Sequence, residues 1–135
     1  MVETASGYAG TVEAIETAYE FMLAYAAQGR DGDAGAVAPA IRGQLERLRE
    51  GMSAVAGEAR AEGKRVGADA QALKGFLGVL EADVAAARAK VELVLAAPSI
   101  GSQLVDNLNA SIHLRAVLTD LFVLDELLKA CRRAK

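Results

Sequence analysis

Apolar side chains recur every three to four residues along most of the chain, and this spacing constrains the fold more than any other feature. The pattern is cleanest between Asp69, a plausible helix cap, and about Ala97. Its seam consists of Leu73, Leu77, Leu80, Val84, Ala87, Val91 and Val94. Alternation by four and three residues places side chains on one face of an α-helix and is typical of left-handed helical bundles. The sequence therefore predicts an all-α protein.

Two further helices are predicted before this one. The first runs from about Thr11, as N-cap, to Gln28, and its seam consists of Tyr8, Val12, Ile15, Tyr19, Met22 and Ala26. Glycines and aspartates between residues 29 and 35 favour a turn after it. The second helix begins between Ala36 and Pro39 and extends as far as Val66, with a seam of Ile41, Leu45, Leu48, Met52, Val55 and Ala59.

Four glycines lie inside the second predicted helix: Gly43, Gly51, Gly57 and Gly63. Each costs about 1 kcal/mol relative to alanine in a helix interior. They mark either points of close approach to a neighbouring helix or a frayed distal half, and the sequence leaves both interpretations open.

The last third of the chain, Ser102 to Lys135, is predicted to be one long helix capped by Ser99 or Ser102. Its second half carries a core stripe of Leu114, Val117, Leu118, Leu121, Leu124 and Leu128. In its first half the apolar side chains lie on nearly the opposite side: Leu104, Val105, Leu108 and Ile112. Supercoiling shifts a stripe by only about 20° per heptad. We therefore expect either a kink around Asn109 to His113, or two halves buried against different surfaces, or one half with a wide apolar arc.

Short connections favour antiparallel neighbours, so the expected architecture is an up-down-up-down four-helix bundle. A chain of 135 residues can bury one core, and we assign residues 11–135 to a single helical-bundle domain. Residues 1–10, which contain Gly7 and Gly10, are expected to be a flexible segment. They show neither the basic start nor the apolar run of a signal peptide, and no uninterrupted apolar stretch reaches about 20 residues. A cytoplasmic protein is expected.

Charge and cysteine content exclude several function classes. The net charge is −3 with both signs interspersed, unlike the basic footprint that nucleic acid requires. A single cysteine, Cys131, excludes an intrachain disulfide and a multi-cysteine metal site. Cys131 lies on the inner side of the last turn of the last helix and is expected to fill the core.

Few residues could carry chemistry. His113 is the only histidine and shares a polar arc with Asp106, Asn109 and Asp120. Glu13, Glu16 and Glu20 line one side of the first helix, but no Glu-x-x-His pair exists for a di-iron site. Asp31-Gly-Asp33 lacks the later ligands of a calcium loop and is expected to be a turn. We therefore predict no enzyme activity, no catalytic residue, no metal and no cofactor.

Two short segments carry family resemblances. Residues 111–119, Ser-Ile-His-Leu-Arg-Ala-Val-Leu-Thr, followed by Glu-Leu-Leu at 126–128, are similar to the H-box of histidine-kinase dimerisation helices. Residues 70–75, Ala-Gln-Ala-Leu-Lys-Gly, are similar to the motif of histidine phosphotransfer bundles. The phospho-accepting positions are Ile112 and Gln71, and His113 is one residue late. The resemblance implies at most a phosphotransfer-like or pseudo-phosphotransfer regulatory role, and we keep it as an alternative.

The favoured functional prediction rests on Phe122, Val123 and Leu127. These side chains are apolar, yet they lie outside the core stripe of the last helix. Such residues suggest a second buried surface. We therefore expect self-association or a protein partner, as in a homodimer, an adaptor, or an assembly or secretion chaperone. The competing hypothesis is a small-molecule or cofactor site inside the bundle, lined by Tyr19, Met22 and His113.

Overall fold

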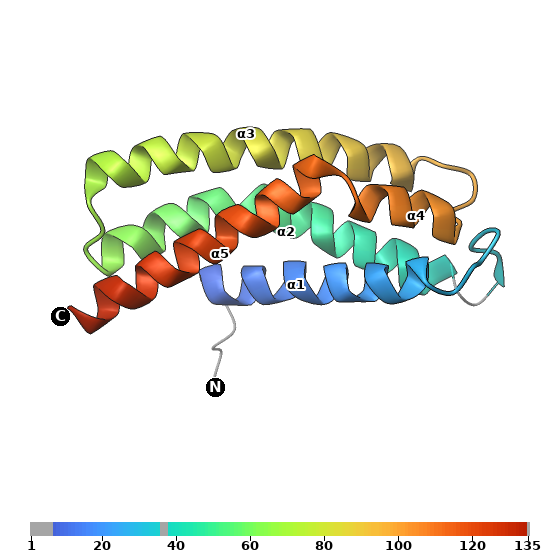
Figure 1. The fold of residues 1–135 in the computed structure, drawn as a ribbon, viewed down its shortest axis with the longest axis horizontal. Helices are drawn as coiled ribbons and strands as arrows, with labels where there is room; N and C mark the ends of the chain where they lie inside the picture. Colours follow the sequence, from blue (N-terminus) through green and yellow to red (C-terminus); the bar gives the residue numbers. More distant parts are fainter. Residues whose placement is uncertain (1–6, 36–37, 135) are drawn as a thin grey trace.

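The computed structural model describes residues 7–35 and 38–134, which form five α-helices and no β-strand (Figure 1). The helices are α1 (Gly7–Ala26), α2 (Ala38–Arg65), α3 (Ala70–Leu95), α4 (Ser102–Asn109) and α5 (Ile112–Arg133). The prediction of an all-α protein is confirmed.

The helices pack around one apolar core. Helix α2 contacts both α1 and α3, while α4 packs mainly against α1 and α5 mainly against α3. In Figure 1, α1, α2 and α3 run along the long axis, and α4 and α5 return along them, with α5 crossing obliquely. The seams predicted for the second helix, the third helix and the second half of the last helix are all buried.

Helix α1 begins one turn earlier than predicted, at Gly7 rather than Thr11. The reason is a tertiary contact: Tyr8 is buried, and its hydroxyl donates a hydrogen bond to Asp125 Oδ1 in α5 at 2.8 Å. Residues 7–10 therefore belong to the helix, and residues 1–6 of the segment predicted to be flexible lie outside the described residues. The helix ends at Ala26, before Gly29 adopts a φ of 67°.

The core face of α1 also departs from the prediction. Ala18 and Tyr25 are buried where Tyr19 and Ala26 were expected, and the latter two are only partly buried. Tyr25 takes its place because its hydroxyl has a partner inside the protein, the carbonyl of Ile100, at 2.6 Å. This rotation leaves Tyr19 at the edge of the core.

Helix α2 is continuous through all four glycines, so the frayed-half interpretation is wrong. A Cβ atom at Gly51 would lie 2.9 Å from Ile15 Cγ1, and one at Gly63 would lie 2.6 Å from Leu73 Cδ2. These two glycines are points of close approach to α1 and α3. Gly57 faces open space, and its Cβ would meet no atom within 4 Å.

The predicted single helix from Ser102 to Lys135 is wrong, because α4 ends at Asn109 and α5 begins at Ile112. Ser111 caps α5: its Oγ accepts hydrogen bonds from the amide of His113 at 3.2 Å and from Lys90 Nζ of α3 at 2.9 Å. The buried Asn109 side chain instead donates to the carbonyl of Met22 in α1 at 3.1 Å. The interruption falls within the predicted range of Asn109 to His113, and the two halves pack mainly against different helices, α4 against α1 and α5 against α3.

Two details around the break differ from expectation. Ile112, grouped by the sequence with the apolar side chains of α4, is 73% exposed, because the break turns it away from them. Gly101, rather than Ser99 or Ser102, is the N-cap of α4. A Cβ at Gly101 would lie 2.7 Å from the carbonyl oxygen of Asp31, so the loop requires glycine there.

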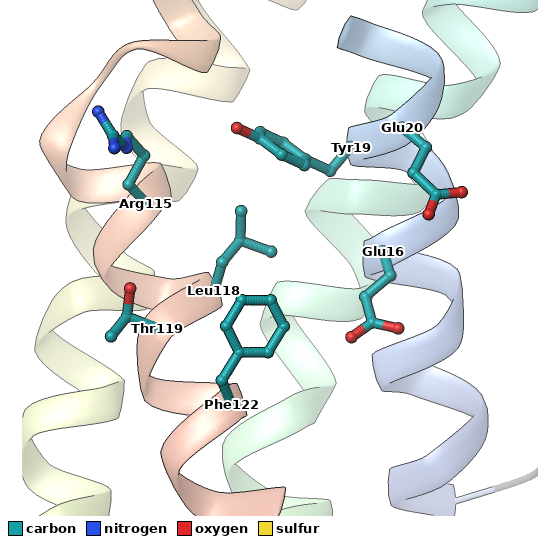
Figure 2. Close-up of a pocket in the computed structure, with 7 residues that line it drawn as sticks. All are labelled: Glu16, Tyr19, Glu20, Arg115, Leu118, Thr119 and Phe122. Carbon is teal, nitrogen blue, oxygen red and sulfur yellow. The ribbon is translucent and has the colours of Figure 1, made fainter.

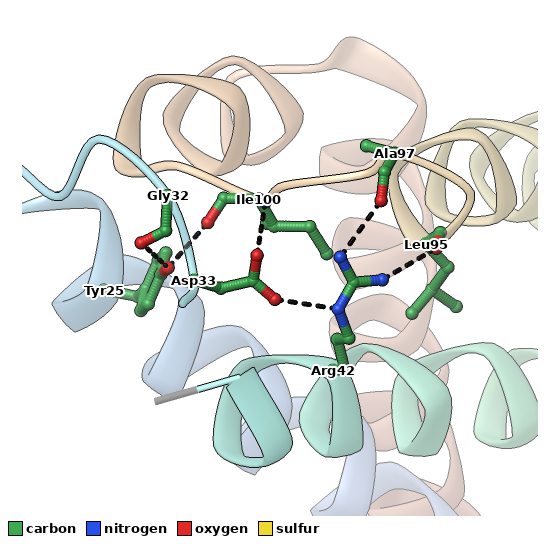
Figure 3. Close-up of polar contacts among 7 residues, drawn as sticks. All are labelled: Tyr25, Gly32, Asp33, Arg42, Leu95, Ala97 and Ile100. Carbon is green, nitrogen blue, oxygen red and sulfur yellow. Dashed lines mark hydrogen bonds and ion pairs between the residues drawn. The ribbon is translucent and has the colours of Figure 1, made fainter. Parts of the chain in front are cut away.

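The Asp31-Gly-Asp33 turn belongs to a polar clamp that joins two loops to α2 (Figure 3). Asp33 is 4% exposed and accepts from the Ile100 amide and from Arg42 Nε, both at 2.7 Å. Arg42 also donates to the carbonyls of Leu95 and Ala97 at the end of α3, each at 3.0 Å. The Ile100 amide and the Arg42 guanidinium hold the pKa of Asp33 below its usual value.

Candidate functional site

A cleft opens between α1 and α5, with a volume of about 470 Å³. We call it the α1–α5 cleft, and its lining residues are Glu16, Tyr19, Glu20, Arg115, Leu118, Thr119 and Phe122. Figure 2 shows Tyr19 extending from α1 toward α5, with the rings of Tyr19 and Phe122 on either side of Leu118. The carboxylates of Glu16 and Glu20 stay on the α1 side, and Arg115 lies at one end of α5.

The break between α4 and α5 explains why the cleft exists. Helix α4 packs on α1, whereas α5 packs on α3, so the chain leaves α1 at the break. Three hydrogen bonds tie α1 to this last third of the chain: Ser102 Oγ to the Tyr25 carbonyl, the Asn109 side chain to the Met22 carbonyl, and Tyr8 to Asp125. The residues of α1 that line the cleft lie between the ties at Tyr8 and Met22.

The cleft carries unneutralised negative charge. Burial raises the pKa of Glu16, and the nearby carboxylates of Asp125, Glu20 and Glu13 raise it further. Within residues 7–35 and 38–134, none of these four carboxylates forms an ion pair. Arg115 is the single cationic side chain in the lining and forms no ion pair with the described residues.

A second, smaller opening lies on the other side of α5. We call it the α3–α5 groove; its volume is about 210 Å³, and its lining residues are Asp69, Ala72, Leu73, Phe76, Val123, Leu124 and Leu127. Six of these seven side chains are apolar. Val123 and Leu127 are 58% and 45% exposed. The groove is therefore an apolar surface formed by two helices.

A pair of carboxyl groups lies on the same two helices. The Asp120 carboxyl of α5 is near Asp83 of α3, and its buried Oδ2 has no hydrogen-bond partner among the described residues. Burial first, and then the nearby Asp83 carboxyl, raises the pKa of Asp120 to about 7. A protonated Asp120 can donate a hydrogen bond to Asp83, which removes the repulsion between α3 and α5.

The structure divides the residues predicted to bind a partner. All three are exposed, Phe122 by 54%, but Phe122 lines the α1–α5 cleft whereas Val123 and Leu127 line the α3–α5 groove. Their role in partner binding stays a prediction. Neither the α1–α5 cleft nor the α3–α5 groove brings the three together.

The residues suggested for an interior ligand site are not brought together either. Tyr19 lines the α1–α5 cleft, while Met22 is fully buried in the core. His113 lines neither opening, and its Nδ1 has no hydrogen-bond partner in the part of the chain that is described. Cys131 is half-buried and packs against the core, as expected.

Sequence reasoning missed the α1–α5 cleft, although two of its signals were visible. The row of Glu13, Glu16 and Glu20 places three carboxylates on one side of the first helix. The change of apolar side near Asn109 indicated that the last helix leaves one neighbour for another. Together these features predict an acidic opening beside α1.

A search of the described residues finds no group of three or more histidine, cysteine or carboxylate side chains that could hold a metal ion. None of the helices in that part of the chain has the length and apolar character needed to cross a membrane. Comparison of the sequence and structure with protein-family models, curated proteins and solved structures finds no match.

Proposed function

We propose that this chain is a non-enzymatic cytoplasmic protein that acts by binding another protein, as a homodimer, an adaptor, or an assembly or secretion chaperone. The observation that supports the proposal is the α3–α5 groove, where Val123 and Leu127 stand exposed beside the partly buried Phe76. We also infer that α4 and α5 together take the place of the fourth helix of an up-down-up-down bundle.

The groove has the character of a protein-binding surface. Its lining is almost free of charge, and interface cores are depleted in charged side chains and enriched in aromatic and apolar ones. An apolar side chain that reaches into such a groove would lose its contact with water against Phe76, Val123 and Leu127. Desolvated anchors of this kind carry most of the binding energy of an interface.

The test is Val123→Lys. A lysine here places a charge at the groove. Its long aliphatic stem still lets the ammonium group reach solvent, because the position is already 58% exposed. We expect the fold to survive and association to weaken by a factor of about 30 or more, the effect of losing a hot-spot residue. The measurement is native mass across a dilution series, on protein purified gently from its own source, with circular dichroism to verify folding.

A matched control is available in α1. Leu23→Lys makes the same kind of change at an apolar side chain that is 47% exposed and lines neither opening. It should leave the assembly intact. If folded Val123→Lys keeps the wild-type mass at low concentration, or if Leu23→Lys disrupts assembly equally, the groove is not the interface. Phe122→Lys then asks whether the interface reaches the opposite side of α5.

A further inference from the structure

We propose that the α1–α5 cleft is a binding site for a small organic ammonium ion. The charged nitrogen would lie near Glu16 and Glu20, and the apolar body would lie against Tyr19, Leu118 and Phe122. This proposal is independent of the α3–α5 groove, because the two openings share no lining residue.

The apolar part of the site is ready for a ligand body. Leu118 is almost fully buried, and the rings of Tyr19 and Phe122 stand beside it from opposite helices (Figure 2). The volume of about 470 Å³ lies within the range typical of small-molecule sites, about 300–1,000 Å³. The ring faces of Tyr19 and Phe122 also attract a cation, since aromatic faces carry negative charge density.

The charges select a cation over an anion or a neutral ligand. Glu16 lies near Glu13, Glu20 and Asp125, and their charges disfavour the ionised form of Glu16. No ion pair with a described residue relieves this repulsion, and Asp125 accepts a hydrogen bond only from the neutral Tyr8 hydroxyl. A bound ammonium group would relieve it. The Arg115 guanidinium at the opposite end of the lining repels a cation, so the ligand must keep its charged nitrogen near α1.

The position of the cleft gives a second reason for a preformed site. The two ties at Tyr8–Asp125 and Met22–Asn109 fix α1 on both sides of the cleft residues. Ser111 fixes the start of α5 through Lys90 of α3. The opening is therefore held by contacts outside it, so a ligand would not have to separate the helices in order to bind.

The first experiment titrates the folded protein with benzylammonium and, separately, with benzyl alcohol, a neutral compound of nearly the same shape. Binding is followed by NMR through the methyl signals of Leu118 and Thr119. We expect saturation with benzylammonium at a Kd of about 1 mM, typical of a fragment of eight heavy atoms. Benzyl alcohol should bind at least about fivefold more weakly, since it lacks the charge.

Two variants test whether Glu16 is responsible for the preference for a cation. Glu16→Gln keeps the shape of the side chain and should weaken benzylammonium binding about fivefold, the scale of one charged contact near the surface. The control Glu46→Gln removes an equal charge from an exposed position on α2 outside the cleft, and it should change the affinity little. Val123→Lys should also leave this affinity unchanged, which separates the test from that of the proposed function.

Several results would overturn the site. They include equal affinity for benzyl alcohol, unchanged affinity in Glu16→Gln, a loss in Glu46→Gln as large as in Glu16→Gln, and no saturation well above the expected Kd. Signals that move only at Phe76 and Leu127 would place the ligand in the α3–α5 groove instead and would equally reject the cleft.

Discussion

Removal of the Arg42 side chain should be among the most damaging single changes outside the apolar core. Arg42→Ala breaks three hydrogen bonds, to Asp33 Oδ2 at 2.7 Å and to the carbonyls of Leu95 and Ala97 at 3.0 Å each. The Asp33 carboxylate, which is 4% exposed in the intact protein, keeps its hydrogen bond from the Ile100 amide but loses its cationic partner. The clamp that joins α2 to the end of α3 is then lost.

The magnitude follows from burial. Breaking a fully buried ion pair costs about 3–5 kcal/mol, but the Arg42 side chain is 29% exposed, so water can solvate part of what it leaves behind. A lost hydrogen bond to a charged group costs about 1.5–3 kcal/mol, and we expect a total of about 2.5 kcal/mol. For a chain of 135 residues this corresponds to a fall in Tm of about 9 °C.

The assay is urea and thermal unfolding of four proteins: wild type, Arg42→Ala, Asp33→Asn and the double variant. Because Asp33→Asn removes the buried charge, Arg42→Ala should cost at least about 1 kcal/mol less in that background. A cost below about 0.5 kcal/mol, or an identical cost in both backgrounds, would refute the reasoning.

The same clamp predicts a pH dependence. The pKa of Asp33 is lowered in the folded state, so its contribution to stability is present above the ordinary pKa of 3.8 and is lost as the pH falls through the lower folded value. The stability advantage of wild type over Asp33→Asn should therefore shrink in acid.

Asp120 should give the opposite pH dependence, because Asp83 and burial raise its folded pKa to about 7 from 3.8. The stabilising contribution of Asp120 is complete below pH 3.8 and is lost as the pH rises to neutrality. Asp120→Asn should therefore flatten the decline in the free energy of urea unfolding between about pH 4 and pH 8. An unchanged slope of that free energy against pH would reject the raised pKa of Asp120. Two glycine substitutions should differ in sign by thermal unfolding. Gly57→Ala should stabilise the protein by about 1 kcal/mol because its site is open and helical. Gly101→Ala should destabilise it by about 1–3 kcal/mol because the added Cβ meets the Asp31 carbonyl. The same sign for both changes would contradict the geometry.

The helices and most of the core follow from the sequence because apolar spacing is a local property. Every seam residue predicted for α2 and α3 is buried, and Asp69 caps α3 through its hydrogen bond to the Ala72 amide at 2.9 Å. The structure departs from these predictions where a hydrogen bond to a residue distant in the sequence sets the start or the buried face of a helix. Tyr8 extends α1 because Asp125 is its partner, and Tyr25 replaces Ala26 in the core because Ile100 accepts its hydroxyl.

The candidate sites could be predicted only in part. Position outside the core stripe correctly indicated that Phe122, Val123 and Leu127 are exposed. It could not indicate which neighbour each side chain stands beside, because that depends on how far the break at Ser111 turns α5. The carboxylates of the α1–α5 cleft were visible in the sequence, but only the folded arrangement shows that no described residue forms an ion pair with them.

The interruption between Asn109 and Ile112 also affects how the native protein opens. A continuous helix transmits unwinding along its hydrogen-bond ladder, whereas here the two segments are held by different neighbours, α4 by α1 and α5 by α3. Because the two segments share no hydrogen-bond ladder, unwinding of one does not pass directly into the other. We therefore expect amide exchange in α5 that need not follow that of α4.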